Sequence, residues 1–457
     1  MESTSSYGSV LKHPGFLNLW TNQIIVQFAY NSLNFALILW VFHLTDSNTA
    51  VASLLIAIYL PSLLFGMFSG VLVDMIDRKK IIIILDFLMA LLVFSLIFFK
   101  FSYVLVLIVT FLINSIAQFY FSAESSSLPI VVKKDQLFAA NSLFSTTFFS
   151  MFLIGFGFSG PIISLFGINF VFFLGSAVLF IAFLLANRFP PLNTKDSSAT
   201  IKLKKAIKLK KTNIAFEIAT DEVKQTIKMI RGKFQISSAL IILASMQAII
   251  GALAAILPSF LEKTLQIRTT DVSYIVIIPL GIGMVCGAFL IGKIGNLIPR
   301  RLLVGRAVLI AGSMLFLVGL APIISPAIQH FPRPRAVSFL HQPSLSTTVA
   351  VGSLLLGIIV VSIIIPSQTV LQENTSDQDR GKVFGVLMAL ISGLSLPPIL
   401  FVGILSDIFG TLPIFIALGG LIAILGFLIL KPDFFFEENH LPYKLREFLG
   451  LGHWEKR

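Results

Sequence analysis

Hydrophobic residues along this chain gather in long blocks, and short polar segments separate the blocks. Each block has close to the ~20 apolar residues with which an α-helix crosses the hydrocarbon core of a bilayer. The pattern therefore predicts an all-α membrane protein. Its twelve transmembrane helices are expected near residues 17–43, 51–74, 80–101, 103–124, 138–163, 168–188, 234–261, 271–293, 301–325, 347–373, 381–407 and 410–431.

The chain carries an internal repeat. Residues 65–80 align without gaps on residues 286–301, and both segments end the second helix of a six-helix half and open a basic loop. Two parallel six-helix repeats are typical of secondary transporters, whose substrate site lies near the bilayer midplane where the repeats meet. We expect an N-terminal half, a linker, a C-terminal half and a tail, over residues 1–188, 189–233, 234–431 and 432–457.

The predicted linker is basic and partly amphipathic. Residues 201–211 hold six lysines, which either lie against anionic lipid headgroups or form a solvated charged run. Further on, Thr220 can cap a short helix that Gly232 can end. Val223, Ile227 and Ile230 give that helix an apolar stripe, so we expect it to lie on the inner membrane surface.

Charged residues make up only 12% of the chain, about half the usual ~25% for soluble domains. The net charge of +12 is distributed by side of the membrane. With the N-terminus inside, 29 of the 34 Lys and Arg residues face the cytoplasm, and five face outward: Lys100, Lys263, Arg268, Arg333 and Arg335. This asymmetry follows the positive-inside rule and predicts that both termini are cytoplasmic. It also argues against nucleic acid as the partner of these cations.

Motifs that would support catalysis or metal binding are not evident in the sequence. The chain has one cysteine, Cys286, within the eighth predicted span, and its histidines form no spaced metal cluster. Neither a nucleophile elbow nor a phosphate-binding loop occurs. We therefore expect a protein that is not an enzyme and that has no cofactor and no metal.

Polar side chains share one face of several predicted spans. In the first span the set lies within an arc of roughly 100° at 3.6 residues per turn. Such groups must face another helix or a wet cavity, because lipid would leave them without hydrogen bonds. Either they line a substrate cavity or they join helices to each other. The candidates are Trp20, Gln23, Gln27, Tyr30, Asn31 and Asn34 in the first span, Asn114 and Gln118 in the fourth, Gln247 in the seventh, and Ser362 and Thr369 in the tenth.

Two acidic residues, Asp86 and Glu124, lie within or at the end of predicted spans. An intramembrane carboxyl group suggests a function, since its burial is costly. Burial favours the protonated form of such a group, so both residues are candidate proton carriers. Asp86 could instead pair with Lys79 or Lys80 of the neighbouring loop.

Several motifs resemble those of one transporter family. Gly70-Val-Leu-Val-Asp74-Met-Ile-Asp77-Arg78-Lys79-Lys80 is similar to the signature loop of the major facilitator superfamily. Residues 12–20, 128–143, 371–384 and 403–410 resemble the branch that contains macrolide efflux proteins and the enterobactin exporter. The fifth span departs from that branch, since Gly155-Phe156 stands where a Gly-Pro is common.

This resemblance implies a monomeric transporter of the bacterial inner membrane that works by alternating access. In the resembled fold the first, fourth, seventh and tenth helices line the cavity, and proton-coupled efflux of a small amphipathic molecule is the expected activity. An importer or flippase for lipid-like molecules remains an alternative, as does a non-transporting membrane receptor.

The resemblance also implies a cytoplasmic latch around the signature loop. Asp74, one turn after Gly70, would accept hydrogen bonds from the N-terminus of the eleventh helix, which follows Arg380. Asp77 belongs to the same loop, and Arg78 would pair with Glu124 at the end of the fourth span.

Overall fold

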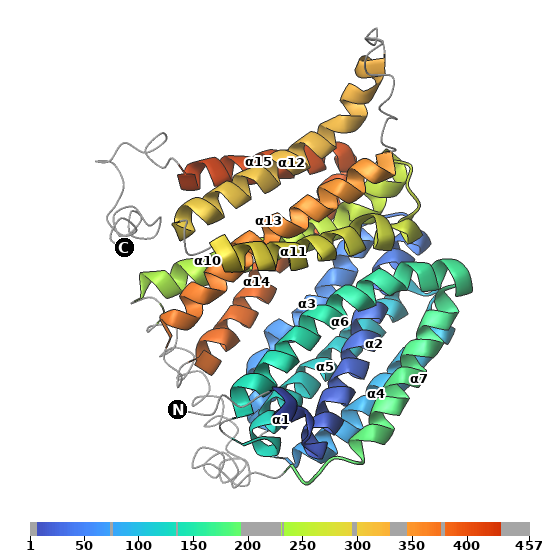
Figure 1. Cartoon of the computed structure of the whole chain (residues 1–457). Helices are drawn as coiled ribbons and strands as arrows, with labels where there is room; N and C mark the ends of the chain where they lie inside the picture. Colours follow the sequence, from blue (N-terminus) through green and yellow to red (C-terminus); the bar gives the residue numbers. More distant parts are fainter. Residues whose placement is uncertain are drawn as a thin grey trace, which may run out of the picture. The chain divides into compact units, whose positions relative to one another are not determined.

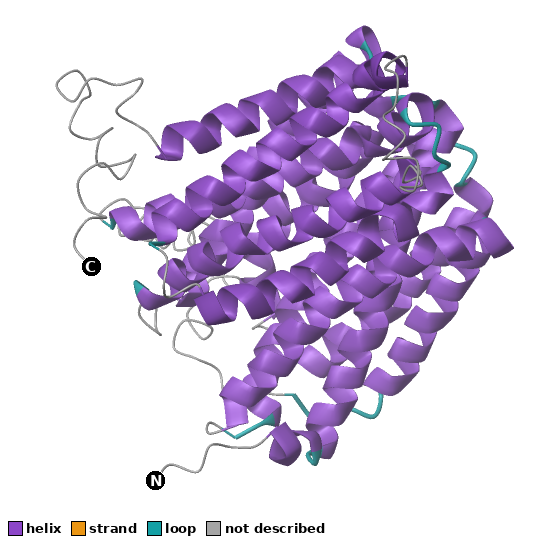
Figure 2. Ribbon diagram, turned by 45° about the horizontal axis from the view of Figure 1, so that its top comes forward, coloured by secondary structure: helices purple, strands orange, loops and turns teal. Residues whose placement is uncertain are grey.

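The described part of the chain is helical, with short connecting loops (Figure 2). In this computed structural model, the described residues are 7–73, 76–133, 136–192, 230, 233–294, 299–329, 345–375 and 380–430. Within them, twelve helices are long and apolar enough to span a bilayer. A helix satisfies its backbone hydrogen bonds internally, which is what a segment in hydrocarbon requires. The prediction of an all-α protein with twelve membrane helices is confirmed.

The helices fall into two compact units, residues 1–45 with 53–227, and residues 46–52 with 228–457. In the first unit a short helix precedes six long ones, which Figure 1 labels by these names. They are α1 (Tyr7–Leu11), α2 (Pro14–Thr45), α3 (Asn48–Val73), α4 (Arg78–Phe99), α5 (Tyr103–Val131), α6 (Leu137–Phe166) and α7 (Ile168–Ala186). The segment 46–52, which contains the first turn of α3, groups with the second unit.

The second unit contains six further long helices, and short π- and 3-10 helices separate the first two of them. The elements are α10 (Phe234–Ser259), π-helix Phe260–Thr264, 3-10 helix Thr269–Asp271, π-helix Ser273–Ile277, α11 (Ile278–Ile294), α12 (Arg300–Gln329), α13 (Leu345–Glu373), α14 (Arg380–Phe409) and α15 (Thr411–Leu430). The predicted helix at 220–232 lies outside the described residues except for Ile230.

Equivalent helices pack together in both units, which supports the repeat. In the first unit, α2 packs on α6 and on α5, and α4 packs on α5 and α7. In the second, α10 packs on α14 and α13, and α12 packs on α13 and α15. Counting helices from the start of each half, the same pairs therefore recur: first with fifth and fourth, and third with fourth and sixth.

Local sequence signals explain several helix ends. Pro14 is the first residue of α2, a position at which a backbone N–H would have no partner within the helix, so the missing N–H of proline costs nothing there. Asp77 caps α4, since its carboxylate accepts a hydrogen bond from the Lys79 backbone N–H at 3.0 Å. Gly167 and Gly410, with φ of 78° and 85°, separate the fifth and sixth helices of the two halves. This left-handed conformation favours glycine and allows the sharp reversal.

Glycines also let helices of the second unit touch backbone to backbone. A Cβ atom on Gly283 would lie 1.9 Å from the Leu354 carbonyl oxygen across α11 and α13. One on Gly312 would lie 2.1 Å from the Ala423 backbone nitrogen across α12 and α15. Small residues at such crossings give close van der Waals packing, on which helices in lipid depend.

Candidate functional site

The amide face of α2 lies in the interior of the first unit. Gln23, Gln27, Asn31 and Asn34 are each at most 7% exposed, while Trp20 and Tyr30 are half-buried. Their hydrogen bonds divide the face into members that join α2 to another helix and members that do not.

The part of this face nearest the N-terminus of α2 is bonded to α6. Trp20 Nε1 donates to Thr147 Oγ1 at 2.7 Å, and Gln23 Nε2 donates to the Phe144 carbonyl oxygen at 3.2 Å. These two bonds join helices, which is the packing role that the sequence left open beside a cavity role.

The middle of the face is bonded to α5. Tyr30 Oη donates to Asn114 Oδ1 at 2.6 Å. The Asn114 amide nitrogen donates to the Thr110 carbonyl oxygen at 2.9 Å and lies 3.5 Å from Asn34 Oδ1. Tyr30, Asn34 and Asn114 therefore form one polar cluster between α2 and α5.

Gln27, Asn31 and Gln118 are the amides of the first-unit face that make no described hydrogen bond to another helix. The Asn31 amide nitrogen donates to the backbone carbonyl and side-chain oxygens of Gln27, at 2.8 and 3.2 Å, and this leaves the Gln27 amide nitrogen without a described acceptor. Gln118 is half-buried and makes no described hydrogen bond. The Gln27 amide nitrogen and the Gln118 amide are therefore candidates for binding a ligand, and the buried Gln23 Oε1 atom also lacks a hydrogen-bond partner.

A buried network that the sequence analysis missed lies on another side of α2. Asn22 Nδ2 donates to Asp86 Oδ2 of α4 and to the Ala182 carbonyl oxygen of α7, each at 3.0 Å. Tyr120 Oη of α5 lies 2.7 Å from Asn22 Oδ1 and 2.9 Å from Glu124 Oε1. Asn22, Asp86 and Tyr120 are 0% exposed and Glu124 is 3% exposed. The two candidate proton carriers thus belong to one network that touches four helices.

Helical geometry explains why Asn22 was missed. It points about 130° away from the middle of the amide face at 100° per residue. A lone amide on an otherwise apolar face of a membrane span could have indicated this network, because a buried amide needs a hydrogen-bond partner on whichever neighbouring helix it faces. Tyr120 was also detectable, because it lies one turn before Glu124 on the same side of α5.

The basic start of α4 does not neutralise these acids in the way the sequence suggested. Lys79 Nζ donates to the Phe189 carbonyl oxygen at 2.6 Å, and Lys80 is exposed. Asp86 is bonded to Asn22, and Glu124 is bonded to Tyr120 where a pair with Arg78 was expected. The i, i+4 spacing of Tyr120 and Glu124 makes the tyrosine the nearer partner.

In the second unit, the predicted cavity residues lie on α10 and α13. Ser362 Oγ donates to the Ile358 carbonyl oxygen and Thr369 Oγ1 to the Ile365 carbonyl oxygen, both at 2.8 Å. Both hydroxyl groups are therefore satisfied within their own helix. Gln247 of α10 is half-buried.

Of the predicted latch, Asp77, Arg78 and Glu124 are described: Asp77 caps α4, Arg78 is buried, and Glu124 is bonded to Tyr120. Asp74 and the surroundings of Gly70 and Arg380 lie outside the described residues.

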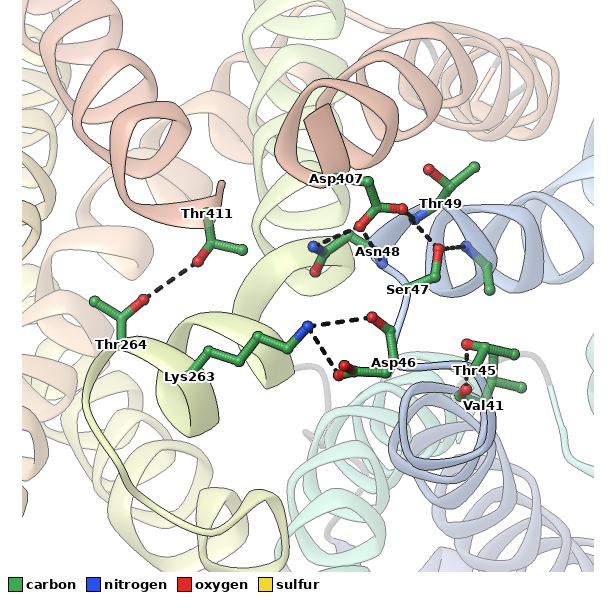
Figure 3. Close-up of polar contacts among 11 residues, drawn as sticks. Val41, Thr45, Asp46, Ser47, Asn48, Thr49, Lys263, Thr264, Asp407 and Thr411 are labelled. Atoms are coloured by element: carbon green, nitrogen blue, oxygen red, sulfur yellow. Dashed lines mark hydrogen bonds and ion pairs between the residues drawn. The ribbon is translucent and has the colours of Figure 1, made fainter. Parts of the chain in front are cut away.

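Asp407 of α14 is a second helix-capping carboxylate, after Asp77, and it caps the N-terminus of α3 within the second unit (Figure 3). It accepts from the backbone N–H groups of Asn48 and Thr49 at 2.8 and 2.9 Å and from Ser47 Oγ at 2.6 Å. A Cβ atom on Gly403, one turn earlier, would lie 3.0 Å from the Asn48 carbonyl oxygen, so the glycine permits this close approach.

The same region contains an ion pair, between Lys263 Nζ and Asp46 Oδ1 at 2.8 Å, which Figure 3 shows beside the cap. A surface cavity of about 600 Å³ lies between these groups, lined by Asp46, Asn48, Ser259, Lys263, Thr264, Ser406, Asp407, Phe409, Gly410, Thr411, Leu412 and Pro413.

Solved structures of transporters share the fold. The chain is similar to a POT family transporter in complex with 5-aminolevulinic acid, with 14% identity, a TM-score of 0.65, and 91% and 95% of the two chains covered. It is similar to the nucleoside transporter NupG, with 13% identity, a TM-score of 0.62, and 91% and 98% covered. A bacterial homolog of the human lysosomal transporter Spinster, in an inward-facing and unoccupied conformation, gives 14% identity, a TM-score of 0.63, and 91% and 97% covered. No curated protein sequence matches the chain.

The sequence itself matches a family across most of its length. The model of the Major Facilitator Superfamily aligns with residues 19–397, which include the whole amide face, both buried carboxyl groups and the signature loop. With twelve membrane helices, a packing pattern repeated in both halves and this match, the chain belongs to the Major Facilitator Superfamily.

Proposed function

We propose that this membrane transporter moves a small amphipathic molecule outward across the bacterial inner membrane, with proton entry driving the export. The observation that carries the proposal is the interior of the first unit. There the Gln27 and Gln118 amides, on α2 and α5, lie on two of the four helices that contribute to a network with two buried carboxyl groups. One set suits a polar ligand and the other suits a proton.

The chemistry of the amide face favours a neutral or weakly polar substrate. Amide and phenol groups offer hydrogen bonds without net charge, and aromatic rings of the same unit offer apolar contact: Tyr30 packs edge-on against Phe121 at 5.4 Å. A compact anion would need a cation, and helices α2, α3, α5, α6 and α7 contain no Lys or Arg. Amphipathic molecules fit such a surface.

Reconstituted vesicles test direction and coupling together. Purified protein in liposomes should transport a substrate, found by thermal-shift screening, against its gradient when protons move the opposite way. Without the pH gradient, we expect only downhill exchange. Uptake of a lipid-like molecule with the proton flux would favour the importer or flippase alternative. Tight binding with no counterflow of any bound compound would favour the receptor alternative.

We further propose that the signature loop acts as a cytoplasmic latch that stabilises the state closed on that side. Asp74 would accept from the N–H groups that begin α14, where the helix dipole favours a negative charge. Asp74→Asn should then slow transport and raise the labelling of cysteines placed on the inner cavity wall. Lys80→Gln, a change at the exposed end of the same loop, is the matched control. Unchanged labelling in Asp74→Asn would contradict the latch and would indicate that the charges of the loop serve only to set the membrane topology.

We also place both termini and the 189–233 linker in the cytoplasm, with the linker lysines against anionic lipid headgroups, and we expect a monomer. The support is the charge asymmetry of the loops.

A further inference from the structure

We infer that Glu124 and Asp86 form a single buried proton site, that the proton resides on Glu124, and that Tyr120 and Asn22 are positioning residues joining the two carboxyl groups. The inference deepens the proposed proton coupling by naming the atom that carries the proton. It follows from counting hydrogen-bond donors in the network.

The orientation of the Asn22 amide is fixed first. The Ala182 backbone carbonyl oxygen can only accept a hydrogen bond, and it lies 3.0 Å from the Asn22 side chain. The atom facing it must therefore be Nδ2, which also faces Asp86 Oδ2 at 3.0 Å. Asn22 Oδ1 consequently points to Tyr120 and can only accept from it.

The tyrosine then has no hydrogen left for Glu124. A phenol carries one hydrogen, and Tyr120 uses it toward Asn22 Oδ1 at 2.7 Å. The shorter of its two contacts is satisfied in this way. The remaining contact, 2.9 Å between Tyr120 Oη and Glu124 Oε1, becomes a hydrogen bond only if the carboxyl group donates. Glu124 must be protonated for Asn22 Oδ1, the Tyr120 hydroxyl and the Glu124 carboxyl all to be hydrogen-bonded.

The alternative arrangement leaves a buried group unsatisfied. If Glu124 were ionised, Tyr120 would donate to it and Asn22 Oδ1, in a side chain that is 0% exposed, would lose its donor. A buried polar atom without a partner is costly, so the protonated arrangement is favoured.

The charges around the network point the same way. Within α2 to α7 the charged or titratable groups are His43, Arg78, Lys79, Lys80, Asp86, Glu124 and the tyrosines. In the described residues neither carboxyl group forms an ion pair. Two ionised carboxylates in one buried network would repel each other without compensation, whereas one proton removes that repulsion.

Asp86 gives the network a second place for a proton. Its Oδ1 atom is buried and has no hydrogen-bond partner, while Oδ2 accepts from Asn22. Asn22 thus holds Asp86 as an acceptor while Tyr120 holds Glu124 as a donor. Both positioning residues act through hydrogen bonds and not through charge of their own.

Infrared spectroscopy of the purified full chain in lipid at neutral pH tests the assignment without requiring transport. A protonated carboxyl group shows a carbonyl stretching band that exposed, ionised carboxylates lack. We expect this band in the wild type and in Asp86→Asn, and its loss in Glu124→Gln. Tyr120→Phe should keep the band but shift it, because the acid loses its acceptor. Tyr103→Phe, near the start of the same helix, should leave the band unchanged.

Three results would overturn the inference: no such band in the wild type, loss of the band in Asp86→Asn with retention in Glu124→Gln, or the same band position in Tyr120→Phe as in the wild type. If Glu124→Gln does not fold, Glu124→Asp replaces it and should shift the band.

Transport measurements separate this inference from the proposed function. A band that behaves as expected beside pH-independent transport retains the proton site and rejects coupling. Proton-driven transport without the band rejects the site and retains coupling.

Discussion

At the scale of single residues, the hydrogen-bond partner decides what an intramembrane polar side chain does. Gln23 and Gln27 are one turn apart on the same face of α2, yet Gln23 is bonded to α6 and Gln27 keeps a free amide nitrogen. Gln118 of α5 likewise makes no described hydrogen bond. Residue type alone could not have separated these roles.

The free amides should therefore be the ones that substrate binding depends on. Gln118→Leu and Gln27→Leu each remove a group available to the ligand. If a buried hydrogen bond is lost, binding should weaken by ~1–3 kcal/mol, or about 5- to 150-fold. Isothermal titration with the identified substrate measures this. Ser115→Ala on α5 is the control, since its hydroxyl is bonded to the Phe111 carbonyl oxygen of its own helix. Full affinity in both leucine variants would assign the face to helix packing.

The Asp407 cap makes a prediction about stability. Asp407→Asn removes the negative charge that faces the positive end of α3, and an amide satisfies fewer of the donors from Ser47, Asn48 and Thr49. We expect a loss of about 1 kcal/mol in unfolding free energy, measured by denaturation in detergent. Asp46→Asn should cost less, because its ion pair with Lys263 is solvent-exposed: the Lys263 side chain is 46% exposed and the Asp46 side chain is 72% exposed. Equal losses would contradict a capping role.

At the scale of helices, close packing in the second unit depends on individual glycines. The α12–α15 crossing gives a matched pair of neighbours. A Cβ atom on Gly419 would lie 2.4 Å from the Phe316 backbone nitrogen, whereas one on Gly420 would meet only the edge of the Phe316 ring, at 3.6 Å. Backbone cannot move aside as a side-chain tip can.

The two alanine substitutions should therefore have opposite effects. Gly419→Ala should destabilise the protein by about 1–3 kcal/mol through overpacking. Gly420→Ala should be neutral or stabilise it by up to ~1 kcal/mol, because alanine favours the helix more than glycine does. Melting temperatures in one detergent measure both. A similar change in the two variants would show that the crossing is looser than the structure indicates.

At the scale of the whole molecule, the distribution of charge predicts which ends of the helices face the cytoplasm. The segment 326–346 is the informative place to test it, because Arg333 and Arg335 there oppose the rule. Most of this segment lies outside the described residues, so its side of the membrane stays a prediction.

Labelling of a single cysteine tests the topology. In a Cys286→Ser background, which removes the exposed native thiol, Ser338→Cys should react with an impermeant maleimide in intact spheroplasts. A cysteine placed in the 189–233 linker should react only after lysis. The reverse pattern would invert the topology of all twelve helices.

The sequence by itself determined the class, the number of spans and the repeat. Blocks of apolar residues can satisfy their backbone only as helices in lipid, so hydropathy fixes such helices with little help from tertiary contacts. The helix ends differ only slightly from this prediction: α2 extends from Pro14 to Thr45, a few residues beyond the predicted 17–43, and Pro14 is a residue that favours the first helical position.

Only the tertiary structure decided which polar groups meet. Asn22 and Asp86 are 64 residues apart in sequence, and the crossing of α2, α4, α5 and α7 places them in contact with each other and with Tyr120. Helical periodicity shows that two residues share a face of one helix, but it does not show which neighbouring helix that face meets. The buried proton site and the Asp407 cap both depend on such meetings between helices distant in sequence. For that reason the pattern of residues predicted the candidates, and the packing assigned their partners.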